Sequence, residues 1–393
     1  MTVHTQHAHP QHVRDEVALA QQLVRLHSPS GAEADAMALL ISTFKTLGYD
    51  DAYLDDAGNA IGVLRRGDGP TLMFNGHLDT VPLGDEALWP HPPLSGTIAD
   101  GRLYGRGACD MKSALACMAY AAKDAAEAGF AGTLMVAAVV QEEVGGLGAR
   151  HLATHTAPDI VVIGEPSKLK LMLGHRGRVE IDVRFPGKIA HAAKNSLGDN
   201  ALYGAAEFLQ RIRDLPLPQG GPLGGSSLTP TLFTSYPRDG ANVVPGRADL
   251  TIDYRNLPGD EPSDILARLQ ALAPDAHFEI PTEFARSENG KVSLDFPRVM
   301  PPYLAPGENA HVNTARTVIR DTLAELDRRF EEDVWWFGTD APYLAESGAL
   351  VIGFGPGEEE LAHTTNESIP LEHLAVARRV YAALASAYLG TPA

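Results

Sequence analysis

Residues 71–82 read Thr-Leu-Met-Phe-Asn-Gly-His-Leu-Asp-Thr-Val-Pro, and the expected fold can be worked out from this stretch. A short apolar run ends at Gly76 and is followed at once by His77 and Asp79. A continuous apolar run of this length, closed by a turn residue, is typical of a strand buried on both faces of a parallel sheet. The stretch therefore predicts a buried strand that ends at two side chains suited to a metal site.

The same pattern recurs along the chain and alternates with stretches of helical periodicity. Short buried strands that alternate with helices predict an α/β fold with a mostly parallel sheet flanked by helices. The expected strands are residues 59–64, 71–75, 134–140, 160–163 and 350–354, and the expected helices are residues 13–26, 33–47 and 114–128.

The middle of the chain changes character. Apolar and polar residues alternate over residues 178–185 and 250–254, as in antiparallel strands with one solvated face, and helical patterns span residues 200–213 and 263–273. We therefore predict a catalytic domain made of residues 1–175 and 291–393, with an inserted α+β domain at residues 176–290.

The composition excludes some classes of function. The chain has 393 residues, of which 50 are acidic and 32 are lysine or arginine, so its formal net charge is −18. A nucleic acid or an anionic membrane surface would require a basic patch, so we expect neither as a partner. No apolar stretch is long enough to cross a bilayer.

The termini and cysteines point to a reduced compartment. Cys109 and Cys117 are too few for a disulfide framework, and the polar start has no apolar signal-peptide core, so we expect a cytoplasmic protein. Residues 1–12 are either an unstructured start, which we favour, or a metal-binding tail. Their histidines are His4, His7, His9 and His12.

Five residues with metal-binding side chains follow apolar runs or glycine turns. In open α/β sheets, ligands gather at the carboxyl ends of the strands, so these side chains can converge although they are far apart in sequence. A mixture of imidazole and carboxylate suits zinc, with cobalt or manganese as substitutes, and a carboxylate can bridge two ions ~3.5–4 Å apart. The candidates are His77, Asp110, Glu143, Glu165 and His363.

Two neighbours of these candidates suggest further roles. Asp79 follows His77 by two residues, so in an extended chain both lie on one face and the carboxylate can accept the free imidazole N–H. Glu142 and Glu143 are adjacent, which fits one metal ligand and one group that moves protons. Each residue alone also has an ordinary explanation, as a strand-end polar pair, a turn or helix-cap aspartate, a solvated loop or a structural histidine.

Four segments together carry a family resemblance: Gly76–Pro82, Tyr104–Lys112, Gln141–Glu143 and Gly164–Ser167. From about residue 14 to the C-terminus, the chain resembles the di-zinc amidohydrolases and metallopeptidases. This family contains acetylornithine deacetylase, succinyl-diaminopimelate desuccinylase, aminoacylase and glutamate carboxypeptidase. The resemblance implies a zinc-exopeptidase-like catalytic domain with two zinc ions per chain. It also implies that the inserted domain is a lid through which a homodimer forms.

The resemblance assigns the candidates to the two metals. Asp110 would bridge both ions, with His77 and Glu165 completing one site and Glu143 and His363 completing the other. Cys109, beside the bridging aspartate, would be a packing residue rather than a ligand.

The resemblance also implies catalytic and substrate-binding roles. Asp79 would orient His77, and Glu142 would be the general base that takes a proton from the bridging water and passes it to the leaving amine. His191 would reach the site of the partner subunit and stabilise the oxyanion, although Asn195 stands where the family usually has proline. The substrate-binding positions would be Asn242, Arg255, Gly338 and Thr339, where the arginine suits a substrate carboxylate.

The function that we expect is metal-dependent hydrolysis of the amide bond in N-acyl-L-amino acids. A di- or tripeptidase, or a carboxypeptidase that acts on short peptides, stays open as an alternative within the family. A non-catalytic binding protein on the same scaffold would lack a ligand or the base, and none is missing. A nucleotide-binding oxidoreductase would need a glycine fingerprint after its first strand, and Gly353–Gly357 contains a proline and has no helical pattern after it.

Overall fold

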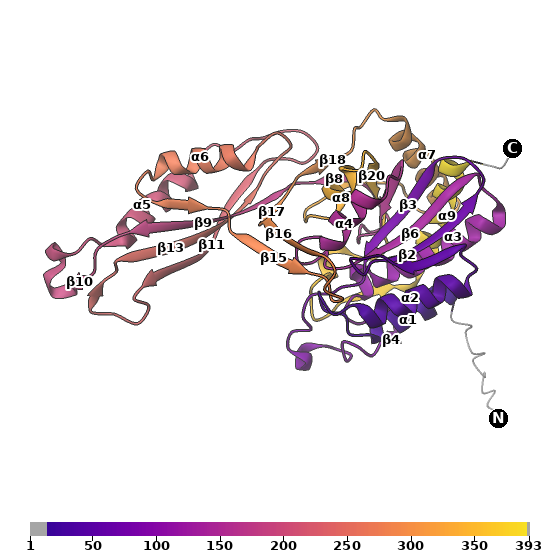
Figure 1. Cartoon of the computed structure of the whole chain (residues 1–393), viewed down its shortest axis with the longest axis horizontal. Coiled ribbons are helices and arrows are strands. Elements are labelled where there is room, and N and C mark those ends of the chain that lie inside the picture. Colours follow the sequence, from indigo (N-terminus) through magenta and orange to yellow (C-terminus); the bar gives the residue numbers. More distant parts are fainter. Residues whose placement is uncertain (1–13, 391–393) are drawn as a thin grey trace, which may run out of the picture.

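The computed structural model describes residues 14–390, and Figure 1 shows a larger α/β body beside a smaller, elongated one. The histidine-containing start, with His4, His7, His9 and His12, lies outside the described residues. Within residues 14–390, no helix is long and apolar enough to cross a membrane. Cys109 and Cys117 are both buried and free.

The larger body is built on one mixed sheet whose centre is parallel. Within the described residues this sheet has nine strands in the order β1-β2-β6-β3-β7-β20-β8-β18, with β19 beside β8. Strands β6, β3, β7 and β20 run parallel to one another, which confirms the predicted fold class. The strands are β1 (Asp51–Leu54), β2 (Ala60–Arg66), β3 (Thr71–His77), β6 (Gly132–Val139), β7 (Ile160–Ile163), β8 (Leu171–His175), β18 (Tyr303–Leu304), β19 (Glu332–Trp335) and β20 (Leu350–Gly353).

Helices cover both faces of this sheet, which is why its central strands are continuously apolar. In β3, Leu72 and Phe74 belong to one hydrophobic core and Met73 belongs to the other, as the alternation of an extended chain requires. The first core contains side chains from α1 (Asp15–Arg25), α2 (Ala34–Thr46), α3 (Ser113–Ala128), α7 (Ala310–Ala324) and α9 (Leu371–Leu389), and the second contains side chains from α4 (Leu147–His155) and α8 (Ala341–Ala345).

The smaller body is an antiparallel sheet with its own hydrophobic core (Figure 1). Its strands follow the order β11-β13-β9-β14, with β17 beside β9, and the alternating residues Val179, Ile181 and Val183 are buried. We propose that residues 176–290 are the inserted domain and form most of this body, which β17 joins from beyond that range. Its elements are β9 (Arg178–Pro186), β11 (Ser227–Tyr236), β13 (Arg247–Arg255), β14 (His277–Glu279), β17 (Val299–Met300), α5 (Ala201–Arg213) and α6 (Pro262–Leu272).

Short elements complete the two bodies. The hairpin of β15 (Thr282–Arg286) and β16 (Ser293–Pro297) buries Ala285 and Phe296 in the core of the larger body. At the far end of the smaller body, β10 (Ala190–His191) pairs with β12 (Val243–Val244) (Figure 1). A further small sheet contains β4 (Thr97–Ala99), β5 (Arg102–Tyr104) and β21 (Ser368–Pro370), and single helical turns occur at Glu86–Leu88, Ala108–Lys112, Ala192–Leu197 and Glu359–Leu361.

Candidate metal centre

The candidate ligands come together because neighbouring parallel strands end at the same edge of the sheet. His77 is the last residue of β3, Glu143 follows the end of β6, and Glu165 follows the end of β7. Since β3 pairs with both β6 and β7 in parallel, these three positions lie side by side. Asp110 joins them from the distorted helical turn before α3, and His363 from a loop after β20.

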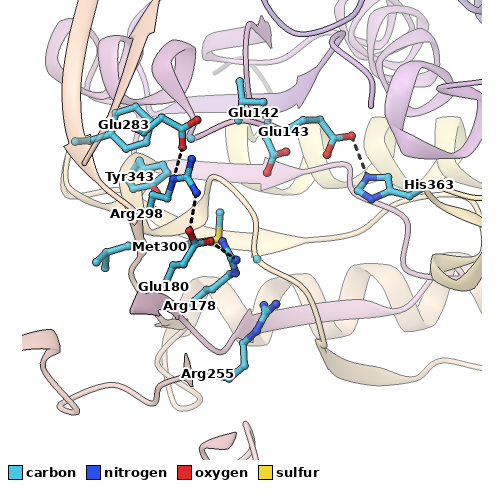
Figure 2. Close-up of a pocket in the computed structure, with 15 residues that line it drawn as sticks. Glu142, Glu143, Arg178, Glu180, Arg255, Glu283, Arg298, Met300, Tyr343 and His363 are labelled. Atoms are coloured by element: carbon cyan, nitrogen blue, oxygen red, sulfur yellow. Dashed lines mark hydrogen bonds and ion pairs between the residues drawn. The ribbon is translucent and has the colours of Figure 1, made fainter. Parts of the chain in front are cut away.

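The carboxylate of Asp110 stands between two groups of ligands. Its Oδ1 lies 3.1 Å from His77 Nε2, and His77 Nε2 lies 3.4 Å from Glu165 Oε1. Its Oδ2 lies 3.2 Å from His363 Nε2. Figure 2 shows the next contact of this imidazole, in which His363 Nε2 lies 3.0 Å from Glu143 Oε1. The two oxygens of one carboxylate therefore face two different imidazole–carboxylate pairs, which is the arrangement that a bridging ligand requires.

The donor set fits divalent metal ions. Donor atoms of His77, Asp110 and Glu143 all lie within 4.8 Å of one another, as do those of His77, Glu142 and Glu165. Burial raises the pKa of Glu165 to about 8, and it also raises the pKa of Glu143 above its ordinary value. Buried carboxylates crowded in this way need positive charge beside them, which a metal ion supplies.

The imidazole of His77 is oriented with its Nε2 toward the cluster. Its Nδ1 lies 2.9 Å from the backbone oxygen of Asp79 and 3.4 Å from the Asp79 carboxylate. A carbonyl oxygen can only accept, so Nδ1 carries the proton and Nε2 is left for a metal. The sequence led us to expect that the carboxylate orients the ring, whereas the closer partner is the backbone oxygen of the same residue.

The carboxylate of Asp79 instead holds the backbone of the two glutamates. Its Oδ1 accepts from the N–H of Glu142 at 3.1 Å, and its Oδ2 accepts from the N–H of Glu143 at 3.2 Å. Oδ2 also accepts from the hydroxyl of Ser30 at 2.7 Å. Since Asp79 is fully buried, these bonds fix the turn that carries both glutamates.

Glu142 lies beside the candidate metal ligands without being one of the paired donors around Asp110. Its carboxylate lines the same cavity as Glu143 and His363 (Figure 2). Burial raises the pKa of Glu142 well above its ordinary value, and the negative charge of Glu165 adds to this effect. A carboxylate with a raised pKa accepts a proton more readily at neutral pH, which suits a general base.

Glycine at position 355 permits the backbone around Glu165 to pack closely. A side chain at Gly355 would place its Cβ only 2.1 Å from the backbone oxygen of Glu165. Close packing against the backbone at Glu165, the candidate ligand after β7, therefore explains why glycine occurs in the segment after β20. A nucleotide-binding turn is not needed to explain it.

A cavity of about 480 Å³ connects the cluster to the smaller body. Figure 2 shows Glu142, Glu143 and His363 on one side of it and Arg255 on the other. The guanidinium of Arg255 donates from Nε to Asp253 Oδ1 at 2.7 Å and from Nη2 to Asp253 Oδ2 at 3.2 Å. These bonds hold the guanidinium at the wall of the cavity, and within residues 14–390 its Nη1 donors have no hydrogen-bond partner and can bind a ligand.

The remaining candidates are placed differently. Gly338 lines the cavity, whereas Thr339 is fully buried, donates from its N–H to His175 and accepts from the N–H of Ala341. His191 and Asn242 lie together where β10 meets β12, at the far end of the smaller body (Figure 1). Within the single chain described, the structure does not bring these two residues to the cluster.

Several buried residues that support the cluster were not identified from the sequence. Glu367 accepts from the N–H groups of Cys109 and Asp110 at 3.0 and 3.1 Å, and it pairs with Arg106 at 2.6 Å. Glu33 accepts from the N–H of Gln141 at 3.2 Å. The carboxylate of Asp340 is buried beside the site, and burial raises its pKa to about 7. No spacing or motif in the sequence marks contacts of this kind.

Comparisons of the sequence find relatives over most of the chain. A model of peptidase family M20/M25/M40 matches residues 73–387. Acetylornithine deacetylase from Myxococcus xanthus is 31% identical over 363 residues, which cover 86% of this chain and 87% of that protein.

Solved structures show the same fold at lower identity. Aminopeptidase PepT from Bacillus cereus ATCC 10987 superposes with a TM-score of 0.75 at 22% identity, covering 95% of this chain and 98% of that one. The YXEP protein of Bacillus subtilis, a dinuclear metal-binding peptidase of the M20 family, superposes with a TM-score of 0.70 at 15% identity, covering 96% and 98%.

Proposed function

Because this chain belongs to peptidase family M20/M25/M40 and is a hydrolase of amide bonds, we propose that it removes the acyl group from N-acyl-L-amino acids. One observation carries the proposal: Glu143 and His363 of the carboxylate–imidazole cluster line the same cavity as Arg255. The cluster suits attack on an amide, and the guanidinium suits a carboxylate on the same small substrate. The relative from Myxococcus xanthus, an acetylornithine deacetylase, supports this substrate class.

The proposed metal site takes two zinc ions per chain, with cobalt or manganese as substitutes. Asp110 would bridge them, His77 and Glu165 would hold one, and Glu143 and His363 would hold the other, as the contacts of the two Asp110 oxygens favour. When bound, such ions lower the pKa of a water molecule toward neutrality and polarise the amide carbonyl.

The protein residues then move the protons of the hydrolysis. The carboxylate of Glu142 takes one proton from the attacking water, whose oxygen bonds to the amide carbon. As the carbon–nitrogen bond breaks, Glu142 passes this proton to the leaving nitrogen, which gives a carboxylic acid and the amine of a free amino acid. The second proton of the water then leaves the carboxyl group and is taken up by the amine, so the final products are a carboxylate and an ammonium group. Asp79 keeps Glu142 in place through the backbone hydrogen bond at 3.1 Å.

The substrate would be anchored across the cavity. The Nη1 donors of Arg255 would bind the α-carboxylate of the amino acid. Gly338 would contribute to the substrate site at the cavity wall, where a Cβ would lie only 1.8 Å from the sulfur of Met300. His191 and Asn242 would act in the site of a second copy, in a homodimer formed through the smaller body, with the imidazole stabilising the oxyanion. Thr339 would shape the substrate site through its buried turn.

A peptidase is the alternative within the same family, because an identical site can cut a peptide bond. Purified protein loaded with zinc or cobalt should be assayed with acetyl-, succinyl- and peptidyl-amino acids. We expect a higher kcat/KM for an acetyl- or succinyl-amino acid than for any di- or tripeptide. A preference for peptides would replace the proposed substrate class with the peptidase alternative. If the protein binds two metal ions yet cleaves none of the assayed substrates, both the deacylase proposal and the peptidase alternative would be contradicted.

A further inference from the structure

We propose that Glu33 is a positioning residue for Glu142, and that it acts through the backbone of Gln141. Its Oε1 accepts from the Gln141 N–H at 3.2 Å, across 108 residues of sequence. The expected effect on kcat rests on the proposed function, whereas the expected effect on the backbone of the turn at Gln141 does not.

The turn at Gln141 is what brings two adjacent glutamates to one site. In a regular strand, Glu142 and Glu143 would point to opposite faces. Strand β6 ends at Val139, and Gln141 then adopts a left-handed backbone with φ of +56°. This region is unfavourable for a residue with a side chain, so the surrounding contacts must hold it.

Two buried carboxylates hold three successive N–H groups of this turn. Glu33 accepts from Gln141, and Asp79 accepts from Glu142 and Glu143. The side-chain amide of Gln141 donates to the backbone oxygen of Arg286 at 2.8 Å, which holds the other end of this residue. Glu33 is thus the acceptor for the first N–H of the turn, at the strained residue itself.

The ordinary explanation for Glu33, a helix cap, does not apply. Glu33 occupies the N-cap position of α2, but its side chain accepts no hydrogen bond from the first turn of that helix. Glu288 instead accepts from the N–H of Ala34 at 2.9 Å. The Glu33 side chain is directed away from the helix. Its Oε1 accepts from the N–H of Gly31 in its own loop at 2.8 Å, in addition to the N–H of Gln141.

The contacts of Glu33 use one oxygen and require only an acceptor. Oε2 is buried and has no hydrogen-bond partner among the described residues. Glutamine would keep the accepting oxygen, whereas methionine has similar length but cannot replace that acceptor. Methionine also suits the surroundings, because Glu33 lines a cavity of about 280 Å³ beside Met37, Leu54 and Val140.

The test compares Glu33→Met, Glu33→Gln and Glu288→Ala with the wild type, all as the metal-loaded full chain. Hydrogen–deuterium exchange is followed in a peptide that covers residues 141–146, and kcat and KM are measured. In Glu33→Met, exchange should accelerate and kcat should fall by about tenfold or more, as for other residues that orient a metal site, while KM changes little. Glu33→Gln should retain wild-type exchange and most of kcat, and Glu288→Ala should leave both unchanged.

The outcomes separate this inference from the proposed function. The inference would be overturned if Glu33→Met showed the same exchange rate as the wild type. It would also be overturned if Glu33→Gln lost as much kcat as Glu33→Met, because the charge of Glu33 and not its accepting oxygen would then matter. If the wild type hydrolyses no amide but Glu33→Met still accelerates exchange, the proposed function fails and the positioning role stands. Should Glu33→Met not fold, Glu33→Ala replaces it in the same comparison.

Discussion

The carboxylate of Asp79 accepts a hydrogen bond from the backbone N–H of Glu142 at 3.1 Å, across 63 residues of sequence. Its second oxygen accepts from the next N–H, that of Glu143, at 3.2 Å. One side chain therefore holds the proposed base and a proposed metal ligand in a fixed relation. This use of Asp79 is separate from its backbone contact with His77.

Asp79→Asn should lower kcat/KM by about 10- to 100-fold, the range for residues that orient metal ligands. Asparagine has one accepting oxygen, so its NH₂ group would face a backbone N–H where an acceptor is needed. Kinetics and a metal titration would measure the loss. Ser30→Ala is the matched control, because it removes one bond to Asp79 but keeps both backbone contacts, and its effect should be smaller.

Glu142→Gln should lower kcat by roughly 10²- to 10⁴-fold while metal content stays at the wild-type level. Glutamine cannot take up the proton from water, but it leaves the donors around Asp110 in place. Because burial already raises the pKa of Glu142, a neutral side chain should not lower the free energy of unfolding. Turnover close to that of the wild type would exclude Glu142 as the base.

Metal removal should abolish hydrolysis and lower the melting temperature. A ligand present at 100 times its Kd stabilises the folded state by about 2.7 kcal/mol, so two occupied sites should give a clear shift. Chelator-treated protein would be measured by calorimetry and then titrated with zinc, cobalt or manganese. Activity that survives complete removal of metal would contradict a metal-dependent hydrolysis.

Arg255→Lys should raise KM for substrates with a free α-carboxylate by about tenfold or more, because a hydrogen bond to a charged group contributes about 1.5–3 kcal/mol. For a substrate whose carboxylate is replaced by a carboxamide, the KM values of the variant and the wild type should differ far less. Arg298→Lys provides the control, since Arg298 lines the same cavity but pairs with Glu180 and Glu283. Equal effects of both substitutions on KM would argue against a specific role for Arg255.

His175 should make the protein less stable in mild acid. Burial lowers the pKa of His175 to about 4, while an unfolded histidine titrates near 6.5. Below pH 6.5 the unfolded chain therefore binds a proton that the folded chain does not. The free energy of unfolding falls toward pH 4 and levels off below it, by about 3 kcal/mol for this group.

Urea unfolding of wild type and His175→Gln between pH 4 and pH 7 would measure this contribution. The difference between their free energies of unfolding should change across that window. His277→Gln is the control for a surface imidazole, since the His277 side chain is 62% exposed. A difference that stays constant with pH would contradict the expectation for His175.

The main strands could be predicted because their signal is local. Residues 72–74 and 160–163 are apolar throughout, and both lie in buried strands that pair in parallel. The hairpin of β15 and β16 was not predicted, because its alternation is short and its burial depends on the larger body. The pairing of β21 with β5 joins residues far apart in the chain and has no local signal either.

The amino-acid sequence was enough to identify the side chains of the candidate metal centre, since each donor type follows a strand or a turn that local pattern reveals. The family resemblance implied how these donors are shared, and only the tertiary structure gave the contacts, with one oxygen of Asp110 facing His77 and the other facing His363. It also decided which buried carboxylates hold the backbone around them. Such bonds join a side chain to an N–H group that every residue except proline carries, so no residue pattern can mark them in advance.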